Sequence, residues 1–212
     1  METLVLSVGA LEENCIIAWN DPSAAWIIDP GAEPGRIVSA VRRLGLAPAL
    51  VALTHAHFDH IGAIPGLLGE WPGLPVHIAP GDVQVAFDPR NKWEPDYSAI
   101  DRPSSLSADL LDGALLEAGG LRAEIAHTPG HTPGSVCFVF REGGVIATGD
   151  TLFAGSCGRT DFPGGDPAAM RKSLARLAAL PPELRVIAGH GPETTIARET
   201  ACNPYMTGLS FR

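Results

Sequence analysis

A dense group of potential metal ligands stands in the stretch 53–62, which reads Leu-Thr-His-Ala-His-Phe-Asp-His-Ile-Gly. Three imidazoles and one carboxylate fall within six positions, directly after an apolar run; they are His55, His57, Asp59 and His60. Histidine is the commonest side-chain metal ligand, and near pH 7 much of it is neutral and able to coordinate. Four such groups would be poor core material, because each polar head needs a partner when buried. These residues therefore favour a metal centre over chance clustering on the surface.

Three further polar residues each follow an apolar run elsewhere in the chain. They are His131, Asp150 and His190, which come after the runs 121–126, 145–148 and 186–188. Ligands at strand ends can converge on one edge of a sheet, where rigid strands hold the loop residues in place. Gly149 and Gly189 each precede one of these residues and allow backbone geometry that a larger residue resists. The pattern predicts one site assembled from distant segments.

Short strands and helices must position these residues. The expected strands cover 3–8, 15–19, 24–29, 49–54, 76–79, 121–127, 136–140, 145–148 and 184–188. The expected helices cover 36–44, 62–71, a short segment from residue 81, 167–180 and 194–201. Asp166 and Pro167 form a good N-cap and first-turn pair. Two halves, each with several strands before a helix, predict two mixed sheets packed together with helices outside.

Residues 88–107 form the least regular part of the chain, with three prolines, several charges and two aromatics. We call this segment the excursion. Long loops in compact domains are often functional lids, and a merely tolerated surface insertion is the alternative. Periodicity does not choose between them.

Composition limits the classes of function. The chain has 212 residues and a net charge of −9, which argues against nucleic acid as the main partner because phosphate binding needs a basic surface. Its four cysteines are far apart and do not resemble a disulfide framework. No apolar run approaches the roughly 20 residues that span a membrane, and no signal segment opens the chain. We therefore expect a cytoplasmic protein with reduced thiols and no membrane partner.

The set His-x-His-x-Asp-His, followed by His131, Asp150 and His190, resembles the metallo-β-lactamase superfamily over almost the whole chain. Within it, segments that resemble the glyoxalase II branch are 128–135, 149–153, the Gly-Arg-Thr-Asp-Phe stretch 158–162, and 189–192. The resemblance implies a single α/β domain over residues 1–212, built as a four-layer αββα sandwich of two mixed sheets.

The resemblance also implies a two-metal centre. One ion would be held by His55, His57 and His131. The other would be held by Asp59, His60 and His190, with Asp150 bridging the two and Asp59 also orienting the nucleophile as a catalytic residue. Two divalent ions about 3.5–4 Å apart can share a water and lower its pKa from 15.7 to about 7. Five nitrogen and two oxygen ligands suit Zn²⁺, and imidazole and carboxylate also suit iron and manganese.

The implied reaction is hydrolysis of a small-molecule thioester, S-D-lactoylglutathione or a related one, of the hydroxyacylglutathione hydrolase type. Full-length glyoxalase II enzymes carry a C-terminal helical domain that grips glutathione, and this sequence resembles the short forms without it. The excursion is then a candidate for gripping the substrate. The alternative is a persulfide dioxygenase with one iron held by two histidines and an aspartate, acting on glutathione persulfide; the Gly189-His190-Gly191 ending favours the hydrolase.

Four other residues have simpler interpretations. His77 lies in an apolar run and is expected to be a core or edge histidine. His127 precedes His131 by four positions in a repeated Thr-Pro-Gly context, so spacing alone does not choose between them; the resemblance favours His131 as ligand. Arg159 is a candidate substrate contact, although an internal ion pair with Asp161 is favoured. Cys157 is expected to be a packed thiol.

Overall fold

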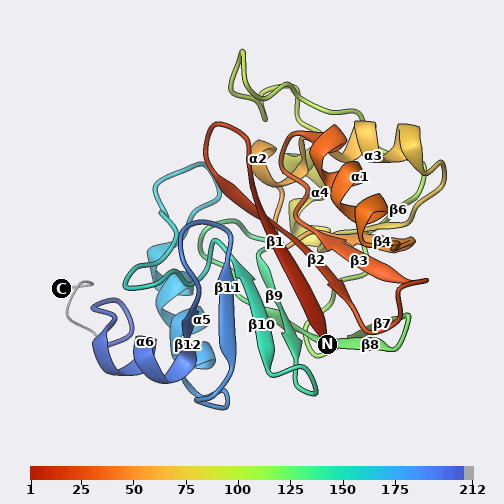
Figure 1. Ribbon diagram of the computed structural model, residues 1–212. Coiled ribbons are helices and arrows are strands. Elements are labelled where there is room, and N and C mark those ends of the chain that lie inside the picture. The colour runs from red at the N-terminus through yellow and green to blue at the C-terminus, as the bar shows by residue number, and fades with distance from the viewer. Residues whose placement is uncertain (208–212) are drawn as a thin grey trace.

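The computed structural model describes residues 1–207, which form two six-stranded sheets with helices outside them (Figure 1). The first sheet, in spatial order, contains β1 (Glu2–Val8), β2 (Glu13–Trp19), β3 (Ala25–Ile28), β4 (Pro48–Ala52), β5 (Val76–His77) and β6 (Leu106–Ser107). The second contains β12 (Thr194–Thr195), β11 (Arg185–Ala188), β10 (Val145–Gly149), β9 (Val136–Phe140), β8 (Leu121–His127) and β7 (Leu115–Ala118). Both sheets are mixed. In the first, the neighbouring strands from β3 to β6 pair in parallel, and in the second, β10 pairs in parallel with β11.

Alternate residues of the central strands feed different hydrophobic layers. Trp26 and Ile28 of β3 pack between the two sheets, where the rings of Trp26 and Phe140 meet edge to face at 5.5 Å. Ala25 and Ile27 of the same strand pack on the opposite face. Strands buried on both faces read as continuous apolar runs, which is why the sequence shows them so clearly.

Helices cover the outer face of each sheet, as Figure 1 shows. Over the first sheet lie α1 (Pro34–Arg43) and α3 (Ile64–Glu70), with the short α2 (Phe58–Ile61) and α4 (Val83–Ala86) nearby. Over the second lie α5 (Pro167–Ala178) and α6 (Ile196–Cys202). The Asp166 side chain caps α5, as predicted. The four layers are the predicted αββα sandwich. No helix among residues 1–207 is both long and apolar enough to cross a membrane.

Sequence reasoning missed some of the local structure. The helix expected over 62–71 is α3, which covers Ile64–Glu70, and Pro65 falls in its first turn, where its missing N–H removes no helical hydrogen bond. The short helix α2 was not predicted. The strands β6, β7 and β12 were not predicted. Two of them contain two residues each, and β7 lies at the edge of its sheet with Leu115 49% exposed, so neither length nor burial marks them in the sequence.

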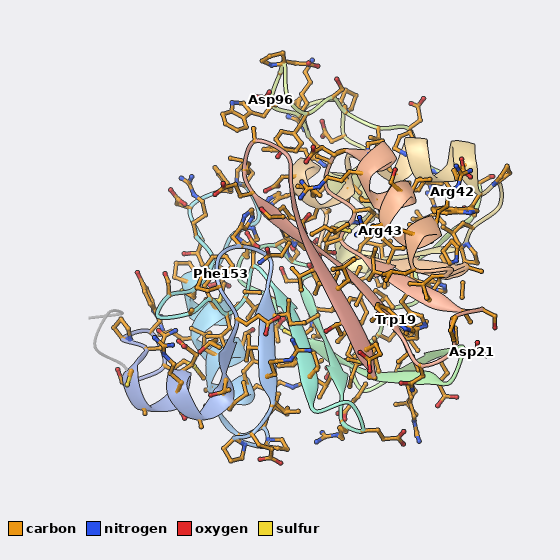
Figure 2. The ribbon with its side chains drawn as sticks, in the orientation of Figure 1. Trp19, Asp21, Arg42, Arg43, Asp96 and Phe153 are labelled. Atoms are coloured by element: carbon orange, nitrogen blue, oxygen red, sulfur yellow. The ribbon has the colours of Figure 1, made fainter. Side chains whose placement is uncertain are left out.

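The excursion stands above α2 as the yellow-green loop at the top of Figure 1, and Asp96 marks its outer part in Figure 2. Its backbone closes on itself through paired hydrogen bonds between Trp93 and Tyr97. Further contacts attach it to the body: the Asn91 amide donates to the Ala56 carbonyl at 2.7 Å, and the Tyr97 hydroxyl accepts from the Leu11 N–H at 3.1 Å. These contacts hold the excursion against the body of the protein.

Candidate metal centre

The site lies at the carboxyl ends of central strands from both sheets. In the first sheet β4 runs parallel to β3, and in the second β10 runs parallel to β11, so the loops that follow each pair leave from the same end of their sheet. Backbone hydrogen bonds join the sheets there, from Val136 to Thr54 and from Asn14 to Gly189, both at 2.8 Å. The strand ends therefore hold the functional loops from both sides.

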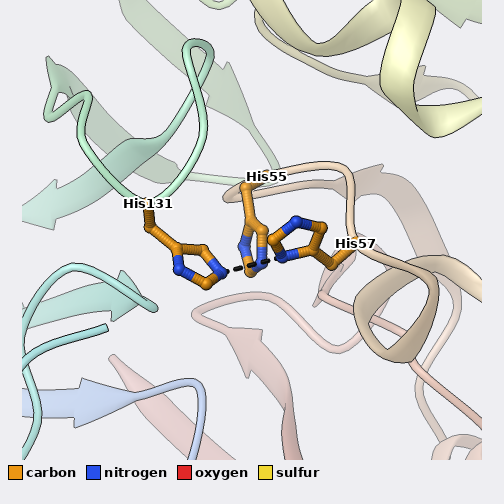
Figure 3. A group of neighbouring side chains, drawn as sticks. All are labelled: His55, His57 and His131. Atoms are coloured by element: carbon orange, nitrogen blue, oxygen red, sulfur yellow. Dashed lines mark hydrogen bonds between the residues drawn. The ribbon is translucent and has the colours of Figure 1, made fainter. Parts of the chain in front are cut away.

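Three of the predicted residues form what we call the first triad, namely His55, His57 and His131, and Figure 3 shows their rings converging. One ring nitrogen from each lies within 4.8 Å of those from the other two. His57 Nδ1 and His131 Nε2 are 2.8 Å apart. Three imidazoles aimed at one point provide a donor set suited to a divalent transition metal.

Three more form the second triad, namely Asp59, His60 and His190, whose potential ligand atoms also lie within 4.8 Å of one another. The Asp59 carboxylate lies 3.3 Å from His190 Nε2 and 3.9 Å from His60 Nε2. This triad combines one oxygen and two nitrogens, so it differs chemically from the first.

Asp150 lies between the triads and turns one oxygen toward each. Its Oδ2 is 3.5 Å from His131 Nε2, whereas its Oδ1 is 3.4 Å from His60 Nε2 and 3.7 Å from His190 Nε2. Gly189 makes this approach possible, because a Cβ there would lie 2.3 Å from Asp150 Oδ1. Gly149 has a positive φ of 47°, and a Cβ on it would collide with Thr54. All seven predicted residues are thus assembled in one place.

Three polar atoms at the centre of this site are buried and have no hydrogen-bond partner within the described part of the chain: His55 Nε2, His60 Nε2 and Asp150 Oδ1. Leaving such an atom unsatisfied costs about 1–3 kcal/mol, and more when it is charged. Bound cations would satisfy all three at once. The residues present therefore fit a metal centre.

The triads differ in the pKa of their histidines. Burial, reinforced by neighbouring imidazoles, lowers the pKa of His57 to about 4 and holds that of His55 well below its usual value. Burial acts in the same direction on His60 and His190, but the carboxylates of Asp150 and Asp59 outweigh it and raise both pKa values. Although burial opposes it, the surrounding imidazoles lower the pKa of Asp150 and keep its carboxylate ionised.

Four of the five histidine rings are oriented through Nδ1, which leaves Nε2 facing the centre. The Nδ1 contacts are His55 with Thr54 Oγ1 at 3.1 Å, His60 with Asp29 Oδ2 at 2.9 Å, His131 with the Arg159 carbonyl at 2.7 Å, and His190 with the Leu11 carbonyl at 3.0 Å. Such contacts fix the tautomer and the orientation of a metal-binding imidazole.

Asp29 is a functional residue that sequence reasoning missed. It follows β3, and its carboxylate accepts hydrogen bonds from the N–H and hydroxyl of Thr54 at 2.7 and 2.5 Å and contacts His60 at 2.9 Å. Although Asp29 groups with His55 and His60 as a potential ligand, its oxygens already have these partners. Its signal was an aspartate directly after an apolar run, the same signal that identified Asp150.

A cavity of about 690 Å³ opens over the two triads. Its wall is largely aromatic, and it carries two cations; the lining includes Phe58, Lys92, Trp93, Phe153, Arg159 and Phe162. Arg159 forms the predicted ion pair with Asp161, with two contacts of 2.7 Å, and its guanidinium lies 3.8 Å from the centre of the Phe162 ring. Lys92 and Trp93 come from the excursion.

The remaining candidates lie outside the triads. His77 Nδ1 contacts Asp109 at 2.9 Å, and His127 Nε2 contacts the Pro133 carbonyl at 2.9 Å. Cys157 lines the cavity, and burial raises the pKa of its thiol to about 11, so it is protonated at neutral pH. Each residue occupies the structural role that the sequence favoured.

Comparisons with known proteins agree with this geometry. The family model of the metallo-β-lactamase superfamily matches residues 8–190. The chain is 35% identical to the hydroxyacylglutathione hydrolase GloC of Haemophilus influenzae, over 99% of this chain and 100% of that protein.

Two solved structures share the fold over nearly their whole length. BLEG-1, a B3 metallo-β-lactamase, has a TM-score of 0.87 and 33% identity, covering 98% of this chain and 100% of its own. TTHA1623 in a di-iron-bound form has a TM-score of 0.83 and 38% identity, covering 95% and 99%. The match over residues 8–190, together with relatives of this similarity, shows that the chain is an enzyme of the metallo-β-lactamase superfamily, a superfamily of metallo-hydrolases.

Proposed function

We propose that the two triads and Asp150 hold two divalent metal ions, and that the protein uses them to hydrolyse a thioester, with S-D-lactoylglutathione as the leading substrate. The observation that carries this proposal is the position of Asp150, whose two oxygens face different triads. A carboxylate in that position can serve two cations at once. When bound, such ions supply a water of lowered pKa and polarise a carbonyl oxygen.

The protein's own groups have distinct tasks in this reaction. His55 and His57 are neutral because burial and neighbouring imidazoles lower their pKa, so each presents a lone pair rather than a proton. Although burial opposes it, His60 and His190 lower the pKa of Asp59, so this carboxylate stays ionised. Asp59 lines the cavity and can accept a hydrogen bond from the attacking water and hold its proton. Asp59 is therefore the proposed catalytic residue.

The thioester assignment draws on the similarity to GloC at 35% identity and on the cavity wall. Lys92 lies half-exposed at the cavity, where a cation suits a thiol that carries carboxylates, as glutathione does. The rings of Trp93 and Phe162, 47% and 41% exposed, offer apolar surface beside the two cavity cations. Arg159 pairs with Asp161 through two contacts of 2.7 Å, whereas Lys92 lies 3.8 Å from Glu94, so Lys92 is the less tightly paired cation and the stronger candidate for contact with an anionic substrate.

Zinc is the metal we propose, since five imidazole nitrogens and two carboxylates suit it, and iron is the main competitor. TTHA1623, at 38% identity, has been solved in a di-iron-bound form, which keeps an iron pair in consideration. We further propose that residues 1–212 form one domain that acts in the cytoplasm. The four cysteines are all free, as expected in a reducing compartment.

Metal analysis and turnover on one preparation test the proposal. About two metal ions per chain, with release of glutathione from S-D-lactoylglutathione, would support it. One iron per chain with oxygen uptake on glutathione persulfide would overturn it in favour of a dioxygenase. A β-lactam hydrolysed with a higher kcat/KM than any thioester would replace the proposed substrate class.

A further inference from the structure

Asp82 is a buried carboxylate outside both triads, at the end of the short 3₁₀ turn Pro80–Asp82. Its side chain is reached by three hydrogen-bond donors. The Ala56 N–H donates to Oδ2 at 2.9 Å, the Thr132 hydroxyl donates to Oδ2 at 2.7 Å, and the Gly134 N–H donates to Oδ1 at 2.6 Å. These donors belong to two loops that lie far apart in the sequence.

Each of these loops carries part of the first triad. Ala56 lies between His55 and His57, and Thr132 directly follows His131. Asp82 therefore ties together the two chain segments that must meet for the three imidazoles to converge. Gly134 permits the contact, since a Cβ at that position would lie 2.6 Å from the Asp82 carboxylate.

The peptide unit at Ala56 is also held from its other end. While its N–H donates to Asp82, its carbonyl accepts from the Asn91 amide of the excursion at 2.7 Å. The backbone between the first two histidines is thus fixed on both sides. An imidazole on a fixed backbone keeps its direction toward the third ring without reorganisation.

The chemistry of the donors requires an ionised carboxylate. All three partners are donors, so both oxygens must accept, and an amide at this position would turn its NH₂ group toward another donor. Burial raises the pKa of Asp82, and the three hydrogen bonds oppose that shift. A charge this deeply buried persists only when such partners compensate it.

We propose that Asp82 is a positioning residue that sets the metal affinity of the first triad by holding the His55–His57 loop against the His131 loop. The inference rests on the proposed metal ligands, but it concerns only one of the two metal positions. None of these hydrogen bonds joins Asp82 to a residue of the second triad. Replacing Asp82 should therefore weaken metal binding at the first triad more than at the second.

The test measures Zn²⁺ affinity of chelator-stripped protein by competition with a chromophoric chelator. Asp82→Asn is introduced into a His190→Ala background, where the first triad remains, and into a His57→Ala background, where the second remains. We expect affinity to fall on the order of 10- to 100-fold in the first background, as for other residues that orient metal ligands. In the second background the change should stay below about twofold, as for independent sites.

Glu199→Gln is the matched control. Glu199 is also a buried carboxylate with three donors, the Thr194 hydroxyl, the Gly155 N–H and the Asn203 amide, at 2.6, 2.7 and 2.8 Å. It separates the general cost of a disturbed buried carboxylate from an effect on metal position. Thermal unfolding of each variant is followed in parallel. If Asp82→Asn does not fold, Thr132→Val, which removes one of the three donors to Asp82, is measured in the same two backgrounds.

Selective weakening of the first position by Asp82→Asn or Thr132→Val, without such selectivity in Glu199→Gln, supports the inference. Unchanged affinity, or equal weakening of both positions, overturns it while leaving the ligand set intact. If the unsubstituted protein binds no Zn²⁺, the ligand set and the inference fall together.

Discussion

The first and second triads differ in charge although they flank the same carboxylate. Burial and neighbouring rings keep the pKa of His55 and His57 low, that of His57 at about 4. In the second triad, carboxylates overcome burial and raise the pKa of His60 and His190. Near pH 7 and without metal, His55 and His57 offer lone pairs, whereas an incoming cation must compete more strongly with protons at His60 and His190. The two positions should therefore fill under different conditions.

The largest expected effect comes from removing the group that the triads share. In Asp150→Ala, both metal positions lose a carboxylate oxygen. We therefore expect loss of metal and a fall in kcat on the order of a thousandfold. Each tenfold step in rate corresponds to about 1.36 kcal/mol of lost transition-state stabilisation. Elemental analysis and thioester turnover on the same sample measure both. A variant that keeps two ions and full turnover would show that Asp150 does not bridge.

Single ligand variants should separate the positions. His57→Ala and His190→Ala are each expected to reduce the metal content from about two ions per chain to about one, because each leaves the other triad intact. The ion left in His190→Ala should resist acid, whereas the ion left in His57→Ala should be released more readily. Elemental analysis after dialysis at two pH values gives the answer. Loss of both ions in both variants would mean that the triads act as one cooperative unit.

The pH dependence of metal binding should differ between the triads. Since the pKa values of His60 and His190 are raised, lowering the pH adds competition from protons first at the second triad. Affinity there should fall by about tenfold per pH unit for each proton displaced, whereas His57, with its pKa of about 4, adds no proton competition over this range. Zn²⁺ titrations at pH 8 and pH 6 distinguish them. Parallel losses at both positions would contradict this assignment of protons.

The smallest effect is expected at His77, which belongs to neither triad. Its contact with Asp109 is at the surface, where the Asp109 side chain is 51% exposed, and such pairs contribute about 0–1 kcal/mol. His77→Ala should therefore keep its metal content and turnover, with a melting temperature close to that of the unsubstituted protein. A loss of either ion would require a contact between His77 and the centre that the fold does not contain.

Much of the site could be predicted because its residues follow strands buried on both faces. Asp150 and His190 stand directly after the apolar runs of β10 and β11, and a parallel pairing brings both strand ends to one edge. The order of strands and helices in the two halves predicted two packed sheets with helices outside, and the family resemblance implied the four layers. Asp29 carried this signal as well, but it had no metal-ligand motif beside it and was missed.

Other features could not be predicted, since they depend on contacts between distant segments. Asp82 and Thr132 are 50 positions apart, and no local pattern relates them. Glu13 is fully buried where the start of β2 pairs with His190, and burial raises its pKa, yet nothing around it in the sequence distinguishes it from a surface glutamate. The strands β6 and β12 are defined by their partners alone.

In the proposed function, the excursion contributes to substrate contact and the triads activate water, so the two tasks lie in different parts of the molecule. Lys92 and Trp93 supply wall without belonging to either triad, while Asn91 and Tyr97 attach that wall to Ala56 and Leu11. New substrate preferences should thus arise by exchanging the wall residues while the contacts of Asn91 and Tyr97 and the pairing of β6 with β5 are kept. Loop grafts between superfamily members should succeed when they retain the Asn91 and Tyr97 anchors and leave β6 in the sheet, so the segment 88–105 is the unit of exchange.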